Sequence, residues 1–203
     1  MPVMCATPIL TSSCGGSEKA SRASYDGRMD GEALVDLHEF RREKDDFFRT
    51  DPMSPVLPEQ RQSFAGLAYF EPDETFTFEV MPEVFDEPEA VVLQTSDADT
   101  RTYERWANLP FSVDGTEVGL TLYRDPEGGG LFLPFQDATS GDETYGAGRY
   151  LELPVLEDGR VLLDFNYAYH PFCAYNPAYS CPIPPFENRL PVAIRAGERN
   201  PEG

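Results

Sequence analysis

Beyond Phe64 the chain alternates apolar and polar residues in short runs, and this pattern limits the fold more than any other feature of the sequence. The run 75–80 (TFTFEV) shows the period of two that a strand with one buried face produces. Similar runs occur at residues 65–70, 90–95, 102–113, 117–124, 130–135, 145–153, 161–165 and 190–196. No stretch between them has the length of a crossover helix, which argues against a parallel α/β sheet. The sequence therefore predicts a mostly β domain, either a β-sandwich or a partly open barrel.

One amphipathic helix precedes the strands. Its inner face carries residues that recur at spacings of four and three, namely Ala33, Leu37, Phe40, Lys44 and Phe47. Of these only Lys44 is polar, and mostly charged residues occupy the positions between them. The pattern predicts a helix that begins near Asp30 as N-cap, ends at about Arg49 and packs across the domain.

The charge of the chain restricts its partners. Its 203 residues include 36 acidic and 16 basic side chains, which give a formal net charge of −20, and the acids are spread along the chain. We expect such self-repulsion to require counterions, which suits an environment rich in salt. The same charge argues against nucleic acid and against anionic lipids as partners. The length suits one domain, which we predict over residues 30–200.

The first 29 residues are typical of a signal segment followed by a flexible tether. The apolar stretch 3–10 is too short to span a bilayer, and small residues separate it from Cys14 and the polar segment GGSEKASRAS. This order resembles the end of a bacterial lipoprotein signal peptide, in which the cysteine is acylated. It predicts a protein outside the cytoplasm that contacts the membrane only through lipid on Cys14. The alternative is a frayed terminus on a cytoplasmic protein.

Two dense blocks near the C-terminus, residues 131–153 and 163–198, carry several recognisable motifs. They are FQDATSGDETYGAGRYL (135–151), LDFN (163–166), Cys173-Ala174, CPIPP (181–185), NRL (188–190) and AGE (196–198). This collinear set resembles an uncharacterised family of bacterial and archaeal proteins, domain-of-unknown-function family 1684. The resemblance implies no known activity. It implies a fold in which the C-terminal segment holds a cluster of polar side chains.

Polar residues of these blocks form the candidate binding site. Beside Arg149 we predict a polar pocket lined by Asp137, Thr139, Ser140, Thr144 and Tyr145. Alternatively, these side chains bond the backbone of their own turn. Arg149 and Arg189 suit a ligand carboxylate or phosphate, or else they form internal ion pairs with neighbouring acids. Asp164 and Asn166, which share one face of a strand, and Asn188 complete the candidate set.

Cys173 and Cys181 enclose a loop of seven residues and remain as an even pair once a signal segment is removed. In an exported protein such a pair predicts a disulfide that staples a proline-rich segment. Two alternatives stay open. The cysteines are thiols, or they bind zinc or copper together with His170 and a fourth ligand from elsewhere in the chain. We expect no cofactor.

Aromatic residues recur among prolines in the last block, at Tyr167, Tyr169, Phe172, Tyr175, Tyr179 and Phe186. They suit a wall for a flat or carbohydrate-like ligand. They equally suit a proline- and aromatic-rich loop that folds over the open end of a barrel, where large side chains replace missing sheet contacts.

Catalysis would require one of two arrangements. A hydrolase could use a pair of acids drawn from Asp137, Asp142, Glu143 and Asp164. A triad could combine Ser140, His170 and Asp164, although Ser140 lacks the G-x-S-x-G elbow. The sequence therefore predicts a non-catalytic protein that binds a small ligand or has a structural role in the cell envelope. A hydrolase that uses the acids of the same cluster is the alternative.

Overall fold

The computed structural model describes residues 36–127 and 130–201. In this part the elements are α1 (Leu37–Thr50), β1 (Thr77–Val80), β2 (Glu83–Gln94), β3 (Thr100–Val113), β4 (Thr116–Arg124), β5 (Leu131–Phe135), β6 (Arg149–Leu151) and β7 (Val161–Asp164), with short 3₁₀ turns between them. Strands β2 to β6 form one antiparallel sheet in sequential order, and β1 pairs with β7 in a second sheet. The mostly β fold with one N-terminal helix is therefore confirmed. It is sandwich-like, and the described strands do not close a barrel.

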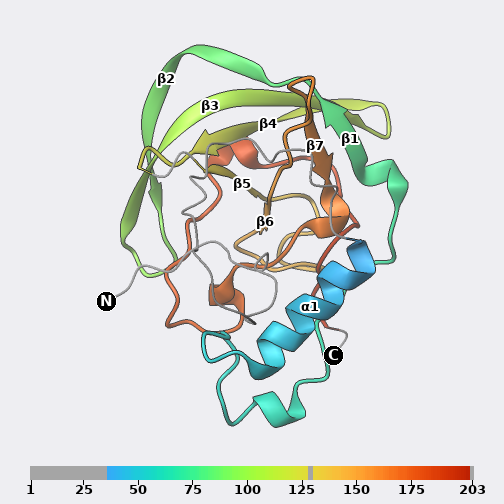
Figure 1. The fold of residues 1–203 in the computed structure, drawn as a ribbon. Helices are drawn as coiled ribbons and strands as arrows, with labels where there is room; N and C mark the ends of the chain where they lie inside the picture. Colours follow the sequence, from blue (N-terminus) through green and yellow to red (C-terminus); the bar gives the residue numbers. More distant parts are fainter. Residues whose placement is uncertain (1–35, 128–129, 202–203) are drawn as a thin grey trace, which may run out of the picture.

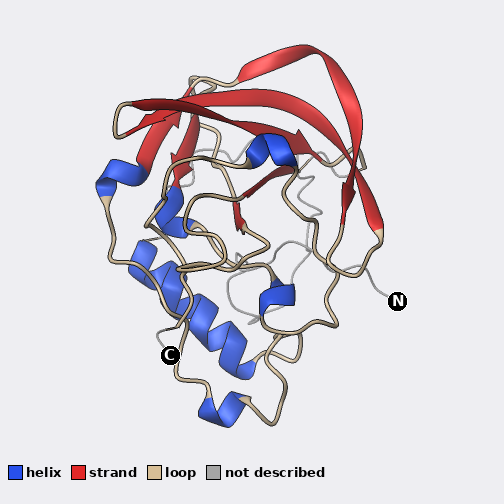
Figure 2. Ribbon diagram, turned by 180° about the vertical axis from the view of Figure 1, so that it is seen from behind, coloured by secondary structure: helices blue, strands red, loops and turns tan. Residues whose placement is uncertain are grey.

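The long strands β2, β3 and β4 arch over one side of the molecule, and α1 lies at the opposite side (Figure 1). Between them runs the C-terminal third, mostly as irregular backbone (Figure 2). β3 and β4 meet at a tight turn where Asp114 and Gly115 have φ angles of 49° and 77°. Two positive φ angles are typical of the hairpin turn that the sequence Asp-Gly favours.

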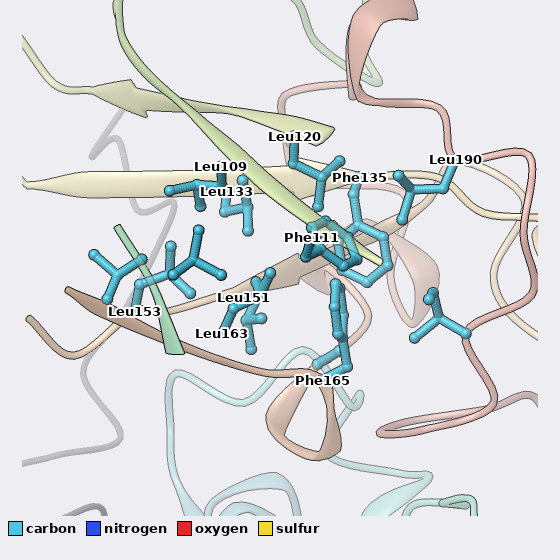
Figure 3. Packing of buried hydrophobic residues seen from close by; sticks show 14 of the residues in the cluster. Leu109, Phe111, Leu120, Leu133, Phe135, Leu151, Leu153, Leu163, Phe165 and Leu190 are labelled. Atoms are coloured by element: carbon cyan, nitrogen blue, oxygen red, sulfur yellow. The ribbon is translucent and has the colours of Figure 1, made fainter. Parts of the chain in front are cut away.

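The main hydrophobic core lies between the two sheets and the C-terminal segment. Leu109, Leu120 and Leu133, from three neighbouring strands, are fully buried. The ring of Phe165, just after β7, meets the ring of Phe135 with centroids 5.2 Å apart (Figure 3). Burial of each such side chain stabilises the fold by roughly 1.5–3 kcal/mol.

A second, smaller core lies on the other face of the main sheet. It contains Leu93 of β2, three residues that alternate with those of the main core along β4, β5 and β6, and one cysteine of the C-terminal segment: Leu93, Tyr123, Phe132, Tyr150 and Cys181. Because side chains alternate across a strand, both faces of β4 to β6 are covered, one by each core.

Helix α1 begins at Leu37, later than the predicted start near Asp30. Asp36 is its N-cap, because its carboxylate accepts two N–H groups of the first turn at 3.0 and 3.2 Å. The helix ends at Thr50, close to the predicted end at Arg49. It is too short and too polar to cross a membrane, and no other helix in the described residues meets that requirement.

The inner face of α1 packs on the C-terminal segment. The ring of Phe48 contacts Tyr175 at 4.9 Å and Phe172 at 6.0 Å between centroids, and Phe40 contacts Tyr167 at 5.1 Å. The helix therefore covers irregular backbone rather than a sheet, and the residues of that backbone supply the ring contacts.

Two predicted runs, 65–70 and 190–196, are not strands. In the first, Tyr69 makes only an isolated bridge to Glu198. In the second, Leu190 and Val192 bond to backbone of residues 136–138, whereas the backbone of Ile194 and Ala196 bonds to polar side chains, and those contacts form the candidate site below. Alternation alone does not distinguish these two runs from strands, because a period of two indicates which face is buried and not which groups the backbone bonds to.

The predicted run 145–153 is a strand only at Arg149–Leu151. The residues before it form turns that end at Gly148, whose φ is 100°. A Cβ at this glycine would lie 2.5 Å from the carbonyl oxygen of Phe135, so only glycine fits. The predicted signal segment, the tether and Cys14 lie outside the described residues.

Candidate functional site

The guanidinium of Arg149, at the start of β6, is the largest fully buried side chain of the described residues. Its Nη2 donates to Oδ1 of Asp137 at 3.3 Å and to the carbonyl of Ile194 at 2.8 Å. Its Nη1 donates to the carbonyls of Ala196 at 2.5 Å and Glu198 at 3.2 Å. Burial lowers the pKa of Arg149 and the Asp137 carboxylate opposes this, so the guanidinium keeps its proton. Arg149 thus ties three carbonyls of the C-terminal segment to β6.

Asp137 is held from its other side by its own turn. Thr139 donates its N–H at 3.3 Å and its hydroxyl at 2.8 Å, and the Ser140 hydroxyl donates at 3.3 Å. The N–H of Ile194 donates to Oδ2 at 2.7 Å, and the hydroxyls of Thr139 and Thr144 lie 3.0 Å apart. Of the predicted polar residues, Asp137, Thr139, Ser140, Thr144 and Arg149 come together here. The side chains of this turn bond one another and the turn's own backbone, and Asp137 also forms an internal ion pair with Arg149.

Asn188 repairs a gap in the main sheet. β4 and β5 pair at Tyr123 and Arg124, and the same register would place Thr121 opposite Pro134, which has no N–H. The fully buried side chain of Asn188 occupies that position. Its Oδ1 accepts the N–H of Thr121 at 2.8 Å, and its Nδ2 donates to the carbonyls of Thr121 at 2.8 Å and Pro134 at 2.7 Å. The amide replaces ladder bonds that proline cannot make.

Asp164 and Asn166 form a separate polar contact at the end of β7. Oδ1 of Asp164 accepts the N–H of Asn166 at 2.9 Å and its Nδ2 at 2.8 Å. The Asn166 side chain also bonds both the N–H and the carbonyl of Asp73 at 2.9 Å. The pair therefore fixes the loop before β1, and its bonds run to that loop rather than to Asp137.

The side chain of Arg189 also lies apart from the buried pair. It is exposed, and its guanidinium lies 5.6 Å from the ring centroid of Phe186, which is 81% exposed. Only the backbone of Arg189 is close to the Asp137 turn, through a bridge to Gln136. The structure thus brings Asp137, Thr139, Ser140, Thr144 and Arg149 together and does not bring the Arg189 guanidinium to them.

A second buried ion pair joins α1 to the C-terminal segment, and the sequence analysis did not predict it. Nζ of Lys44 lies 2.7 Å from Oε2 of Glu198, and each side chain is 1% exposed. The same carboxylate accepts the N–H of His170 at 3.0 Å. The ring of Tyr169 lies 4.7 Å from the Lys44 nitrogen. The signal for this site was the single polar residue on the apolar face of the helix, because a buried lysine requires a partner.

His170 is a neutral link in this buried group. Its Nε2 accepts the N–H of Tyr145 at 3.2 Å, so its proton is on Nδ1, which lies 3.7 Å from Oε1 of Glu198. Burial, with smaller effects of Arg149 and Lys44, lowers the pKa of His170 to about 3. With both ring nitrogens engaged, His170 is not placed to bind a metal. No group of three metal ligands occurs in the described residues.

The triad alternative is not assembled either. Ser140 donates to Asp137 and not to a histidine, and Asp164 bonds Asn166. His170 faces Tyr145 and Glu198. A general base for Ser140 is therefore missing among its contacts.

Cys173 and Cys181 lie side by side as thiols, so the structure does not contain the predicted disulfide. The N–H of Cys173 donates to Sγ of Cys181 at 3.4 Å, and the hydroxyl of Tyr145 lies 3.9 Å from Sγ of Cys173. A hydrogen bond from Cys181, followed by others that include Tyr145, lowers the pKa of Cys173 to about 6. Cys181 is 4% exposed, whereas Cys173 is half-buried.

The aromatic residues of the last block form a continuous series of ring contacts beside these thiols. Tyr145 contacts His170, His170 contacts Tyr175, and Tyr175 contacts Phe48, with centroids 6.0, 6.4 and 4.9 Å apart. The hydroxyl of Tyr175 is buried with no hydrogen-bond partner in the described part of the chain. Most of these rings are half-buried, so each packs against the protein on one side and is open to solvent on the other.

Comparisons with known proteins agree with the motifs. The family model described as "Protein of unknown function (DUF1684)" matches residues 62–199. A solved structure, the solution NMR structure of an uncharacterized protein from gene locus rrnAC0354 of Haloarcula marismortui, is 45% identical with a TM-score of 0.63. The match covers 81% of this chain and 92% of that one. No curated protein matches the chain. The chain therefore belongs to the DUF1684 family, whose function is unknown.

Proposed function

We propose that this protein is a non-catalytic structural domain of the cell envelope, in which buried polar side chains lock an irregular C-terminal segment onto the sheet. One observation carries the proposal. The Asp137–Arg149 pair is fully buried, and its hydrogen bonds go to its own turn and to residues 194–198. A group that binds or transforms a ligand needs a face open to that ligand, and this pair has none.

The acids considered for hydrolysis support the same proposal. Asp137 is buried, Asp164 bonds Asn166, and Glu143 makes an exposed ion pair with Arg195 at 2.8 Å. Arg195 lowers the pKa of Glu143, which is the opposite of what a general acid at neutral pH requires. Neither the family description nor the description of the relative from Haloarcula marismortui supports a hydrolase.

The location outside the cytoplasm is part of the proposal. Cys14 would carry the lipid, and the net charge of −20 would be screened by a salt-rich medium. Mass spectrometry of the full chain from its native host tests the anchor, because an unmodified peptide that runs from Met1 through Cys14 contradicts it. Thermal unfolding against potassium chloride tests the salt requirement, for which we expect the unfolding temperature to rise. A flat response contradicts it.

We include the Cys173–Cys181 bridge in this proposal as the state outside the cytoplasm. The adjacency of the two sulfurs supports it, and a bridge of this loop length would stabilise the fold by about 2–3 kcal/mol. Thiol titration of the native protein with and without reductant is the measurement. Two thiols per chain that react before reduction, assigned to these cysteines by peptide mass spectrometry, contradict the bridge.

The structural role is tested by a pair of matched arginine variants. Arg149→Met should lower the unfolding temperature strongly, whereas Arg189→Met at an exposed position should change it little. A thermal-shift screen of the wild-type chain against metabolites and sugars accompanies them. We expect no compound to raise the unfolding temperature. The structural proposal is overturned by a compound that raises the unfolding temperature of the wild-type chain but not that of the Tyr145→Leu variant or of the Tyr175→Phe variant.

A second candidate function is binding of a small or carbohydrate-like ligand on the aromatic surface. The buried Tyr175 hydroxyl favours it, because a buried hydroxyl without a partner in the described residues is a position where a ligand group can bond. In that case Tyr175→Phe weakens the ligand, while the exposed Phe186→Ala serves as the control. Equal loss in both variants contradicts a site at Tyr175.

A further inference from the structure

We propose that Cys173 and Cys181 form a thiol–disulfide exchange pair, in which Cys173 is the attacking sulfur, Cys181 is the resolving sulfur, and the substrate is a small or peptide disulfide. This inference builds on the proposed bridge between the two cysteines. It adds that the bridge is reversible and assigns a different task to each sulfur.

The exposure of the two residues separates their tasks. Cys173 is half-buried on a 3₁₀ turn (Phe172–Ala174), whereas Cys181 is 4% exposed within the second core. Cys173 is therefore the more accessible of the two residues to a disulfide substrate in solution. Because the N–H of Cys173 points at Sγ of Cys181, at 3.4 Å, the second sulfur stands next to the backbone of the first. In this arrangement Cys173 attacks the substrate disulfide from the solvent side, and Cys181 then attacks the mixed disulfide on Cys173 from the protein side.

The surroundings of Cys173 stabilise a thiolate. The Tyr145 hydroxyl lies 3.9 Å from Sγ of Cys173, and the Cys181 thiol also donates to it. The bond from Cys181, with smaller effects of Ser96 and Tyr145, lowers the pKa of Cys173 to about 6, so that most of the thiol is ionised at neutral pH. Burial, together with Cys173, raises the pKa of Tyr145 to about 12, so this tyrosine keeps the proton that it donates.

The backbone holds the resolving sulfur in place. The N–H of Cys181 donates to the Ser96 hydroxyl at 3.1 Å, and the carbonyl of Cys181 accepts the N–H of Ser96 at 2.9 Å. Ser96 lies in the turn that joins β2 to β3. Cys173, by contrast, is on the side of α1, since the ring of its neighbour Phe172 contacts Phe48. A bond between the sulfurs therefore links the helix side of the C-terminal segment to the sheet.

The exchange balances without any further reactant. The Cys173 thiolate attacks one sulfur of a disulfide RSSR, the S–S bond breaks, and RS⁻ leaves and takes a proton from water. The Cys181 thiol then loses its proton and attacks the Cys173 sulfur, which releases the second RS⁻. In sum, the dithiol and RSSR give the protein disulfide and two RSH, so the protein is oxidised and RSSR is reduced. With excess RSH the same steps run backwards.

The test uses the reduced full chain and oxidised glutathione, with peptide mass spectrometry that separates Cys173 and Cys181 from Cys5 and Cys14. In the Cys181→Ser variant, the mixed disulfide with glutathione should accumulate on Cys173. In wild type it should be transient and be replaced by the Cys173–Cys181 bond. Accumulation on Cys181 in a Cys173→Ser variant at a similar rate overturns the assignment of tasks.

A kinetic measurement on the wild-type protein keeps the proposal testable if a cysteine variant does not fold. Alkylation by iodoacetamide at pH 6.5 should label Cys173 at least about tenfold faster than Cys181. Tyr145→Phe should slow labelling of Cys173 by about threefold or more. Tyr179→Phe is the matched control, because that hydroxyl bonds the carbonyl of Met53 and not a sulfur. Equal rates for the two cysteines overturn the proposal.

Failure of the proposed bridge and failure of the exchange give different results. If the two cysteines never oxidise together, the bridge itself is absent. If they oxidise but glutathione cannot reduce the bond, while dithiothreitol in denaturant can, the bond is a structural staple and the exchange is excluded. If glutathione reduces it in the folded protein, the exchange is supported.

Discussion

Replacing Asp137 by asparagine should destabilise the protein far more than the small change in shape suggests. Each carboxylate oxygen accepts at least one hydrogen bond from a donor that cannot become an acceptor. Oδ1 accepts from Nη2 of Arg149 at 3.3 Å and from two hydroxyls, and Oδ2 accepts the N–H of Ile194 at 2.7 Å. An amide has one oxygen and one NH₂ group. Whichever way it turns, its NH₂ group faces either the guanidinium or the N–H of Ile194.

The size of the effect follows from what is left unpaired. One buried donor without a partner costs about 1–3 kcal/mol, and a buried guanidinium without its counter-charge costs about 3–5 kcal/mol. Arg149 keeps its three carbonyl acceptors, so the two costs do not add in full. We expect about 4 kcal/mol of lost unfolding free energy, which lowers the unfolding temperature by about 10 °C for a chain of this length.

Urea unfolding followed by circular dichroism measures this free energy, and the matched control is Asp142→Asn at an exposed position two residues beyond the turn's hydroxyls. The control should change stability by less than about 0.5 kcal/mol. The double variant Asp137→Leu with Arg149→Met, which removes both charges, should be more stable than Asp137→Leu alone. A loss below about 1 kcal/mol for Asp137→Asn refutes the claim that the buried pair locks the C-terminal segment in place.

Three further outcomes follow from the buried groups. The pKa of His170 is about 3 in the fold against 6.5 for the free side chain, so the unfolded chain binds a proton that the folded chain does not. Stability should therefore fall as pH drops from 6.5 toward 3, by about 1.4 kcal/mol per unit, and this slope should flatten in His170→Gln; an unchanged slope contradicts it. Lys44→Met leaves the Glu198 carboxylate buried without its cation and should cost about 3 kcal/mol in urea unfolding, partly restored by adding Glu198→Gln; no restoration argues against the ion pair. Asn188→Leu removes three buried hydrogen bonds and should cost about 3 kcal/mol or more and speed amide exchange at Thr121, whereas unchanged exchange there contradicts the repair of the sheet.

The fold class could be predicted from the sequence because local patterns carry it. The period of two predicted β3 and β4 almost to the residue, and Asp114-Gly115 suits the turn between them. The segment 190–196 failed for a physical reason. It alternates like a strand, yet the backbone of Ile194 and Ala196 bonds the side chains of Asp137 and Arg149, which come from distant positions that no local pattern identifies.

In the candidate site, too, contacts between neighbours in the sequence could be predicted and contacts between distant residues could not. The sequence gathers Asp137, Thr139 and Ser140 in one turn, so their contacts were predictable, including the alternative that they satisfy one another. The distance of Arg189 from the pair depends on which way a side chain points from an irregular backbone, and composition does not determine that. The sequence pattern identified Lys44 as the polar residue on the apolar face of the helix, but its partner Glu198 is 154 positions away.

The buried polar residues of the motifs differ in their surroundings from the cysteine that we propose as reactive. Asp137, Arg149, Asn188 and Glu198 are all buried, and each donates to or accepts from backbone of the C-terminal segment or of the strands beside it. In this segment, side chains make the hydrogen bonds to the backbone that neighbouring strands make in a sheet. Buried N–H and carbonyl groups need such partners even where the backbone forms no ladder. Such residues are constrained by the fold whatever the protein does. Chemistry requires instead a group that solvent can reach and whose charge the fold adjusts, and Cys173 meets both conditions at the edge of that framework. The polar motifs therefore explain why the segment has its shape, and the thiol pair within it is where an activity can be sought.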